Sequence, residues 1–228
     1  MAKISVGLDI GVASIKVVSL DRGQKPPKLV ALGSIHTPQP GMSSDNEEAL
    51  QAVAASIKKL LAASRIDTKE VVAALPESRL FTRVIDDLPY LSDQELSPAI
   101  RYASEEFIPL PISEVNLNWQ ILQRSTNKNA RTIVFVVASP KQLVNKYIRV
   151  FNMIELHLKA LETEIIASSR ALVGANPFSP TTLIVQMGVT TTDFAVVSKG
   201  LILLTRSIAT GGSALTRILA QHFNFEPN

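Results

Sequence analysis

The chain has 228 residues, of which 46% are hydrophobic and 19% are charged. This balance is typical of a folded protein with a sizeable core and excludes a largely disordered chain. Because there is no cysteine, disulfides and cysteine-ligated metal sites are excluded as well. The net charge of +3 is spread along the sequence, and no basic cluster interleaves with aromatic residues, which argues against nucleic-acid binding.

The N-terminus reads directly into a strand-like segment. It lacks an apolar stretch that ends in a small-residue cleavage site, so we expect no signal peptide. No apolar run approaches the roughly 18–20 residues that a membrane span needs. We therefore expect a cytoplasmic protein.

Three strands and a helix are predicted for the first part of the chain. A loop containing Pro38 and Pro40 follows the strands, and Ser44 with Glu47 fits a capping box at the start of the helix. The apolar residues of the helix recur at helical spacing and predict a core-facing side. The strands are expected at Ile4–Ile10, Ile15–Leu20 and Lys28–Ile35.

Residues 70–155 read as an α+β unit of their own. A helix is predicted either from the Ser92 and Glu95 cap to Phe107, or only from Ser97, because Pro98 cannot donate a helical hydrogen bond. A second helix is expected to open at Ser139-Pro140. Trp119 is expected to be a packing residue. The strands of this unit are predicted at Val71–Leu75, Arg79–Leu88, Asn116–Arg124 and Thr132–Ala138.

The last part of the chain alternates again between strands and helices. A strand at Leu158–Thr163 is followed by a helix from Glu164 to about residue 173, and turn residues then form a linker over Asn176–Pro180. A final helix is expected to start at Gly211-Gly212. Three strands precede it, at Leu183–Met187, Thr192–Val197 and Leu201–Ile208.

An internal repeat is the most informative feature of the sequence. The segments Val6–Gly23 and Leu183–Gly200 align without gaps, as VGLDIGVASIKVVSLDRG and LIVQMGVTTTDFAVVSKG. In this alignment Gly11 meets Gly188, and Ser14 meets Thr191. Both segments predict a buried strand, a tight turn and a second strand.

Each turn has a chemical use. Backbone N–H groups in a tight turn of glycine and hydroxyl residues form a concavity that suits phosphate oxygens. In the first turn these residues are Gly11 and Ser14, while Asp9 is suited to hold hydrated Mg²⁺ and Lys16 to offset phosphate charge. In the second turn they are Gly188, Thr190 and Thr191. Either turn alone is better explained as an ordinary β-hairpin, whereas the pair at matched positions in two halves favours a clamp on the phosphates of a nucleotide.

Gly211-Gly212 adds a third candidate element. A helix N-terminus carries unpaired N–H donors and partial positive charge, both of which favour anions. The alternative is a simple helix start after a strand.

Several motifs resemble the superfamily of actin, FtsA and Hsp70. They are the first turn with its flanking Asp9 and Lys16, the second turn through Asp193, and the segment from Thr205-Arg206 to Gly211-Gly212. The middle of the chain looks like the PilM family of type IV pilus assembly proteins. The segments that carry this likeness are Ala74-Leu75-Pro76, Phe81-Thr82-Arg83, Leu88-Pro89, Glu105 to Pro111, Glu114 to Gln120 and Leu161 to Glu164.

The resemblance implies an actin-like α/β fold, a duplicated ribonuclease H-like arrangement with an FtsA-type inserted subdomain 1C and an incomplete second domain. It implies four parts: 1–69, the first part of subdomain 1A; 70–155, subdomain 1C; 156–177, the closing strand and helix of 1A; and 178–228, the start of subdomain 2A. It further implies ATP with Mg²⁺ in the cleft. By analogy with the superfamily, Glu164 would orient a water there, although a helix-start glutamate favoured by the helix dipole is an equal alternative.

The resemblance also implies a partner and a place. PilM-like proteins dock the cytoplasmic N-terminal peptide of the membrane protein PilN, so this chain is expected at the inner-membrane platform that assembles pili, reaching the membrane only through its partner. Other platform and motor proteins are further candidate partners. A competence or secretion system remains open beside a pilus.

Two departures from the family pattern bear on function. Gln186 stands where the family has an aspartate, which predicts very slow or absent ATP hydrolysis. The family also continues past Asn228 with the residues that supply subdomain 2B and the adenosine loop. We therefore expect these 228 residues to bind ATP weakly.

Two other functions fit the same fold. One is an ATP-hydrolysing enzyme, a chaperone or a sugar kinase, but no convincing catalytic base stands out. The other is an FtsA-like cell-division anchor, which needs a C-terminal amphipathic membrane helix. These 228 residues show none, but the alternative stays open because the family continues past Asn228.

Overall fold

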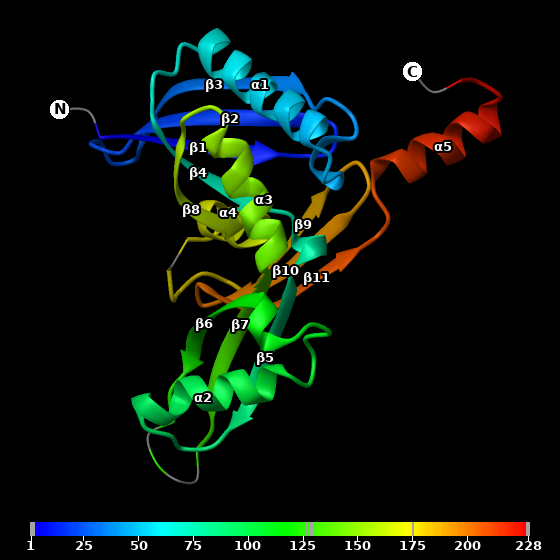
Figure 1. The fold of residues 1–228 in the computed structure, drawn as a ribbon. Helices are drawn as coiled ribbons and strands as arrows, with labels where there is room; N and C mark the ends of the chain where they lie inside the picture. The colour runs from blue at the N-terminus through cyan, green and yellow to red at the C-terminus, as the bar shows by residue number, and fades with distance from the viewer. Residues whose placement is uncertain (1–2, 126, 128–129, 175, 227–228) are drawn as a thin grey trace. The chain divides into compact units, whose positions relative to one another are not determined.

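A computed structural model of the chain describes residues 3–125, 127, 130–174 and 176–226. The chain divides into two compact units. The first comprises Met1–Pro76 and Val144–Glu164, and the second comprises Glu77–Leu143 and Ile165–Asn228. Each unit has its own sheet or sheets (Figure 1).

A five-stranded mixed sheet forms the first unit. Its strand order is β3-β2-β1-β4-β8, with antiparallel pairs from β1 to β3 and parallel pairs from β1 through β4 to β8. In β1 the alternate residues Val6, Leu8 and Ile10 are buried, as expected where one face of a sheet meets a core. The strands are β1 (Ile4–Ile10), β2 (Ser14–Asp21), β3 (Lys28–His36), β4 (Glu70–Leu75) and β8 (His157–Thr163).

Helix α1 (Glu47–Ala63) packs on one face of this sheet through the predicted apolar side. A Cβ at Gly33 of β3 would lie 2.1 Å from Ser64 Oγ and 3.0 Å from Leu60 Cδ1, so a larger residue fits under the end of α1 only if these side chains move. The predicted capping box at Ser44 is wrong. Asn46 is the N-cap because its side chain accepts a hydrogen bond from the Glu48 N–H at 2.9 Å.

The segment of α3 (Lys141–Asn152) that belongs to the first unit is held to the start of α1 by charge. Lys146 Nζ lies 2.6 Å from Asp45 Oδ1, and Arg149 forms an ion pair with Glu47. Lys146 also donates to the carbonyl of Met42, at the short 3-10 helix η1 (Gly41–Ser43). The helix starts later than predicted because β7 continues through Ser139 and Pro140.

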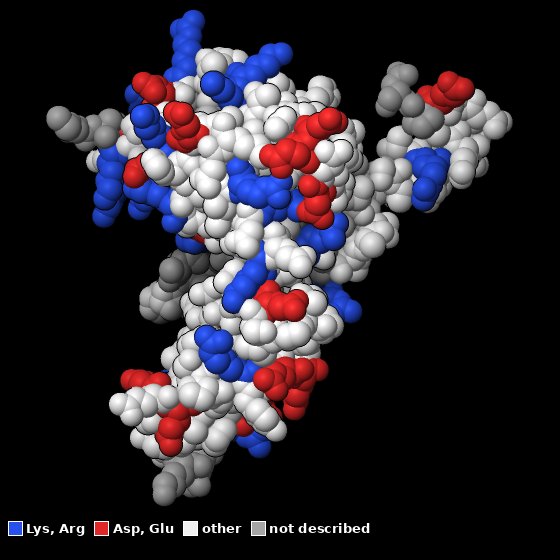
Figure 2. Space-filling model, viewed as in Figure 1, with Lys and Arg blue, Asp and Glu red and all other residues white. Residues whose placement is uncertain are grey.

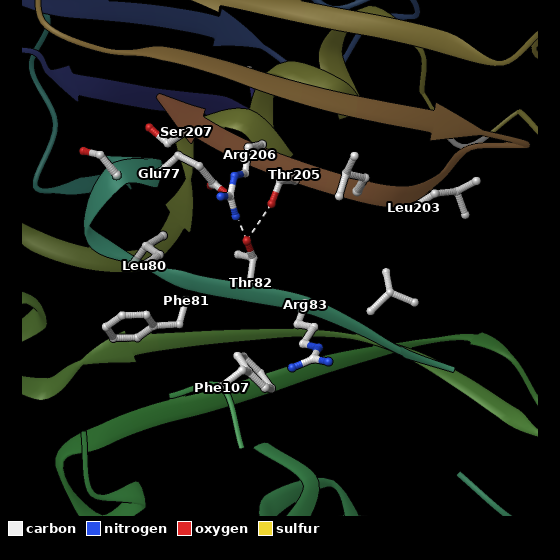
Figure 3. A pocket seen from close by; sticks show the side chains of 13 residues that line it. Glu77, Leu80, Phe81, Thr82, Arg83, Phe107, Leu203, Thr205, Arg206 and Ser207 are labelled. Atoms are coloured by element: carbon white, nitrogen blue, oxygen red, sulfur yellow. Dashed lines mark hydrogen bonds between the residues drawn. The ribbon is translucent and has the colours of Figure 1, made fainter. Parts of the chain in front are cut away.

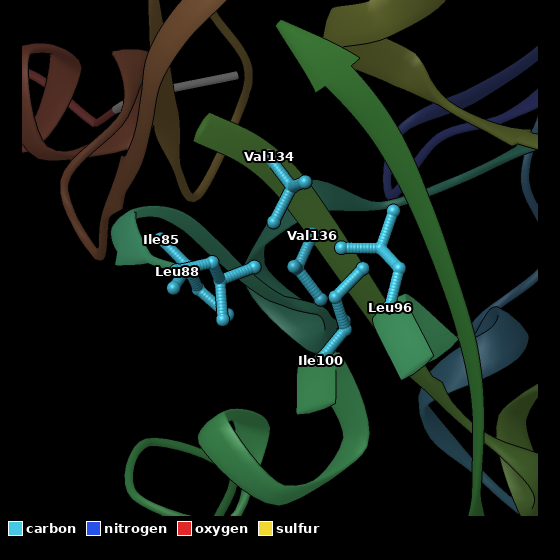
Figure 4. Packing of buried hydrophobic residues seen from close by; sticks show 6 residues of the cluster. All are labelled: Ile85, Leu88, Leu96, Ile100, Val134 and Val136. Atoms are coloured by element: carbon cyan, nitrogen blue, oxygen red, sulfur yellow. The ribbon is translucent and has the colours of Figure 1, made fainter. Parts of the chain in front are cut away.

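The second unit contains residues 77–143 of the stretch that was predicted as an α+β unit, whereas β4 joins the sheet of the first unit. Strands β5 (Phe81–Leu88), β7 (Thr132–Pro140) and β6 (Val115–Gln123) form an antiparallel sheet in the order β5-β7-β6, preceded at β6 by the 3-10 helix η3 (Ile112–Glu114). Helix α2 (Asp93–Ser104) covers it. The buried cluster between them is shown in Figure 4, and Trp119 packs against it as predicted. The cluster consists of Ile85, Leu88, Leu96, Ile100, Val134 and Val136.

Two local predictions for this subdomain are corrected or decided. Residues Glu77–Arg79 form a 3-10 helix, η2, so β5 begins at Phe81 and not at Arg79. Of the two helix starts, the Ser92–Glu95 capping box is the real one, and α2 runs through Pro98. The helix tolerates Pro98 because the carbonyl left without a donor belongs to Gln94, an exposed residue in the first turn where water can reach it.

A second antiparallel sheet in this unit has the order β11-β10-β9. Its core face joins a cluster with Phe135 of β7 and Ile165 of α4, so the two sheets of the unit share buried contacts. The elements are α4 (Glu164–Leu172), β9 (Thr182–Met187), β10 (Thr192–Ser198), β11 (Leu201–Ile208) and α5 (Gly212–Phe223). All three strands lie within one residue of their predicted positions.

Two features of the structure concern binding to nucleic acids and membranes: the distribution of surface charge and the length of the apolar helices. On the face shown in Figure 2, basic and acidic side chains are interspersed, without a broad area of one sign. No helix in the described part of the chain is long and apolar enough to cross a membrane.

Candidate functional site

The first predicted phosphate turn is a tight turn between β1 and β2. The Gly11 N–H donates to the Ser14 carbonyl at 3.1 Å, and the Thr37 hydroxyl donates to the Gly11 carbonyl at 2.7 Å. A Cβ on Gly11 would approach the Ser14 carbonyl oxygen to 3.0 Å, which explains the glycine. The repeat predicted this turn at the correct residues.

Asp9 and Lys16 face each other across the two strands next to this turn. Lys16 Nζ lies 2.8 Å from Asp9 Oδ2, and their side chains are 54% and 39% exposed. An ion pair this exposed contributes no more than about 1 kcal/mol. A phosphate can therefore replace Asp9 as the partner of Lys16, or a cation can replace Lys16 as the partner of Asp9, at a small cost in free energy.

The second predicted turn repeats the first. The Gly188 N–H donates to the Thr191 carbonyl at 2.8 Å, and Gly188 has the same close approach to the carbonyl three residues on, at 3.2 Å from a built Cβ. Thr190 is exposed and Thr191 half-buried. The two copies of the repeat thus have the same local hydrogen bonding, each within its own unit.

The N-terminus of α5 packs directly on this second turn. The Gly212 N–H donates to the Gly188 carbonyl at 2.9 Å, and the Ser213 N–H and hydroxyl both donate to the Val189 carbonyl. Gly211, the N-cap, lies so close to Gly188 and Val189 that no side chain fits. The first N–H groups of α5 are therefore hydrogen-bonded to the turn. Gly211 and Gly212 contribute to a site by holding this turn in place.

The two residues assigned to the handling of water lie on and next to α4. Glu164 is the first residue of α4, at the edge of the first unit. Gln186 lies on β9 in the second unit, where its Oε1 accepts a hydrogen bond from the Ser168 hydroxyl at 2.8 Å. Position 186 is thus a neutral, oriented amide.

A pocket of about 630 Å³ in the second unit was not predicted from the sequence. It lies between β5 and β11, each of which is the outer strand of its sheet. Figure 3 shows Thr82 and Thr205 pointing toward each other across it, with their hydroxyl oxygens 2.7 Å apart. The lining residues are Glu77, Ser78, Leu80, Phe81, Thr82, Arg83, Val84, Phe107 and Leu203 to Ser207.

The pocket combines apolar walls with charge. The guanidinium of Arg83 lies 5.5 Å from the centre of the Phe107 ring, a cation–π contact that holds the arginine at the wall. Phe81 and Leu203 contribute apolar surface, and Arg206 a second positive charge. The sequence signal was present in Phe81-Thr82-Arg83 and Thr205-Arg206, which stood out as motif residues without an assigned role.

The arrangement of His, Cys, Asp and Glu side chains limits how the predicted Mg²⁺ ion can be bound. Among the residues that the structure describes, no group of three or more His, Cys, Asp or Glu side chains is placed to hold a metal ion. A cation held by the described residues would therefore have at most two such side chains as ligands, together with neutral oxygens, water or a bound phosphate.

Comparison with known proteins places the chain in a family. The sequence model for the type IV pilus assembly protein PilM matches residues 7–228. A solved PilM–PilN type IV pilus biogenesis complex is 26% identical with a TM-score of 0.82, and the match covers 97% of this chain and 66% of that one. This chain therefore spans about two thirds of the length of that relative.

Two more distant structures share the fold. The cytoplasmic domain of EpsL, an inner membrane component of the type II secretion system of Vibrio cholerae, is 13% identical with a TM-score of 0.59, covering 99% of this chain and 79% of that one. The ethanolamine utilization protein EutJ from Carboxydothermus hydrogenoformans is 20% identical with a TM-score of 0.53, covering 99% and 59%. The expected actin-like α/β fold is confirmed, and the chain belongs to the PilM family of type IV pilus assembly proteins.

Proposed function

We propose that the chain is a nucleotide-holding scaffold of the inner-membrane platform that assembles type IV pili, and that it docks an extended partner peptide. The observation that carries the nucleotide part is the turn built twice, with Gly11 bonded to Ser14 and Gly188 bonded to Thr191 in the same way. A random pair of hairpins has no reason to share residue spacing, glycine crowding and hydrogen bonding.

The ligand best suited to the turns is ATP with Mg²⁺. Backbone N–H groups around Gly11 and Gly188 favour phosphate oxygens, and the hydroxyls of Ser14 and Thr190 add donors. Lys16 would exchange Asp9 for a phosphate, which frees the Asp9 carboxylate for a hydrated metal ion. When bound, Mg²⁺ supplies charge neutralisation between the phosphates.

Hydrolysis is proposed to be very slow or absent. Gln186 is neutral and engaged with Ser168, so it contributes no negative charge to a metal ion. Removing such a charge takes away electrostatic stabilisation of the transition state, which is commonly the largest catalytic term. Glu164, the first residue of α4, remains the proposed residue for orienting water.

The proposed partner is the cytoplasmic N-terminal peptide of a PilN-like membrane protein. The solved relative is a PilM–PilN complex, and it is the most similar of the structures described above. We propose that the peptide contacts residues 70–155, the proposed inserted subdomain. The other proposed parts are subdomain 1A, formed by 1–69 and 156–177, and the start of subdomain 2A, formed by 178–228. The chain would then lie in the cytoplasm against the inner membrane, held there by its partner.

The pocket between β5, which lies in the proposed inserted subdomain, and β11, which lies in 178–228, supports peptide docking there. Both strands present an edge that is not paired in its sheet, and such edges accept an added extended peptide through backbone hydrogen bonds. Apolar walls at Phe81 and Leu203 would receive the peptide's side chains. The arginines at 83 and 206 favour a peptide that carries an acidic group or exposes carbonyl oxygens.

Amide NMR of the chain during a titration with Mg·ATP tests the nucleotide function, even if binding is weak. We expect concerted shifts of the Gly11 and Gly188 amides and of their neighbours. A Lys16→Ala variant should weaken the response, and Lys159→Ala, which removes an exposed lysine paired with Glu70, should not. Shifts that avoid both turns, or no shifts, would reject the nucleotide role.

A further inference from the structure

Two buried oxygen atoms on adjacent strands of the β11-β10-β9 sheet have no hydrogen-bond partner among the described residues. They are Oδ1 of Asp193 and Oγ of Ser207. Asp193 on β10 lies directly opposite Ser207 of β11 on one side and Gln186 of β9 on the other. Cross-strand partners point to the same face of a sheet, so the three side chains form a row.

Asp193 is 4% exposed, so its carboxylate is almost removed from solvent. Within the described ranges, no lysine, arginine or histidine forms an ion pair with it. An ionised carboxylate that has lost water without gaining a cation or donors is strongly destabilising. Buried polar atoms without partners commonly mark the place of an ion or a water molecule.

The repeat shows what this carboxylate lacks. Residues 9 and 16 of the first copy correspond to 186 and 193 of the second, and both pairs are cross-strand partners. In the first copy the carboxylate of Asp9 meets the ammonium of Lys16 at 2.8 Å. In the second copy the carboxylate has moved to the other strand, and a neutral amide stands where it was. Asp193 therefore has no counterpart of Lys16.

We propose that a hydrated divalent cation of the Mg²⁺ class binds at Asp193, with the Ser207 hydroxyl and the Gln186 amide oxygen beside it. All three groups offer oxygen, the ligand that such cations prefer, and one carboxylate with retained water is a common arrangement for Mg²⁺. The use of this cation for phosphate binding rests on the proposed nucleotide function, whereas the cation site itself does not.

The direct test is binding of Mn²⁺, a paramagnetic substitute for Mg²⁺, to the nucleotide-free chain, followed by electron paramagnetic resonance. Asp193→Asn should weaken binding more than about tenfold. Gln186→Asp should tighten it, because a second carboxylate then faces the first across the strands. Asp86→Asn, which changes an exposed carboxylate of the same unit, is the matched control and should bind as the native chain does.

Thermal unfolding gives a second readout that does not depend on detecting the ion. Without a divalent ion, Asp193→Asn should melt higher than the native chain, because it removes a buried charge. Added Mg²⁺ should raise the Tm of the native chain and leave that of Asp193→Asn unchanged. Equal effects of Mg²⁺ on both proteins, or stabilisation by K⁺ and not by Mg²⁺, would overturn the proposal.

The two proposals can fail separately. If Mg·ATP shifts the Gly11 and Gly188 amides while Asp193→Asn binds Mn²⁺ as the native chain does, the cation site is wrong and the nucleotide function stands. If Mn²⁺ binding needs Asp193 but ATP shifts neither turn, the nucleotide function is wrong and the cation site stands. Loss of Mn²⁺ binding in Asp9→Asn alone would place the ion in the first copy and reject the inference.

Discussion

Replacing Gly211 by alanine should separate α5 from the second turn. A Cβ at this position would lie 2.6 Å from three backbone atoms, the Gly188 oxygen and the Val189 carbon and oxygen. The backbone of Gly211 has φ −134°, an ordinary extended value, so the effect is purely steric. Since backbone atoms cannot rotate away as a side chain can, we expect a loss of about 1–3 kcal/mol of stability, as for overpacked cores.

Gly212→Ala is a matched control one residue away. Its Cβ would meet only the Gly188 oxygen, at 3.7 Å, which is ordinary contact, and alanine is the better helix former. The assay is urea denaturation combined with amide exchange of Gly212 and Ser213, whose N–H groups donate to the turn. Gly211→Ala should lose protection at both amides, and Gly212→Ala should keep it. Equal stability and equal protection in the two variants would refute the packing of α5 on the turn.

Three further predictions concern the second unit. Thr82→Val and Thr205→Val, combined in a double-mutant cycle of unfolding free energies, should show a coupling of about 1 kcal/mol from their shared hydrogen bond, and additive effects would contradict it. Ile100→Ala should cost about 2–5 kcal/mol in urea unfolding, because Ile100 is fully buried between α2 and its sheet; a change near zero would contradict the packing in Figure 4. The pKa of Glu95 lies below its ordinary value, because the Ser92 hydroxyl and then the Ser92 N–H donate to its carboxylate. This stabilisation is present above the ordinary carboxyl pKa and is lost as the pH falls through the lowered pKa. Because Ser92→Ala removes the hydroxyl donor, it should raise the Glu95 pKa in an NMR titration. An unchanged pKa would refute the capping box.

Features that depend on neighbouring residues could be predicted from the sequence. The two turns and the three strands before α5 follow from local patterns of glycine, hydroxyl and apolar residues. The same patterns gave the Ser92–Glu95 cap as one of two possible helix starts. The predicted cap at Ser44 failed for a local reason too, since Asn46 competes for the same donors and lies closer to the helix. Which of two nearby residues becomes the N-cap depends on backbone geometry, which cannot be read from the sequence.

Features that depend on distant residues could not be predicted in the same way. Thr82 and Thr205 are separated by 123 positions, and only the fold brings their hydroxyls together at the pocket. The burial of Asp193 is a similar case, because the sequence shows a carboxylate beside a turn but not that the fold leaves it only 4% exposed. Both became visible only through strand order and packing.

Amide hydrogen exchange with and without the cytoplasmic N-terminal peptide of a PilN-like protein tests the scaffold function most directly. We expect the peptide to slow exchange in residues 77–84, which form η2 and the start of β5, and in 203–207 of β11 across the pocket. A peptide of the same composition in scrambled order should have no effect. If the native peptide protects nothing within residues 70–155, whether it protects only 180–228 or no residue at all, the proposed docking to the inserted subdomain is wrong.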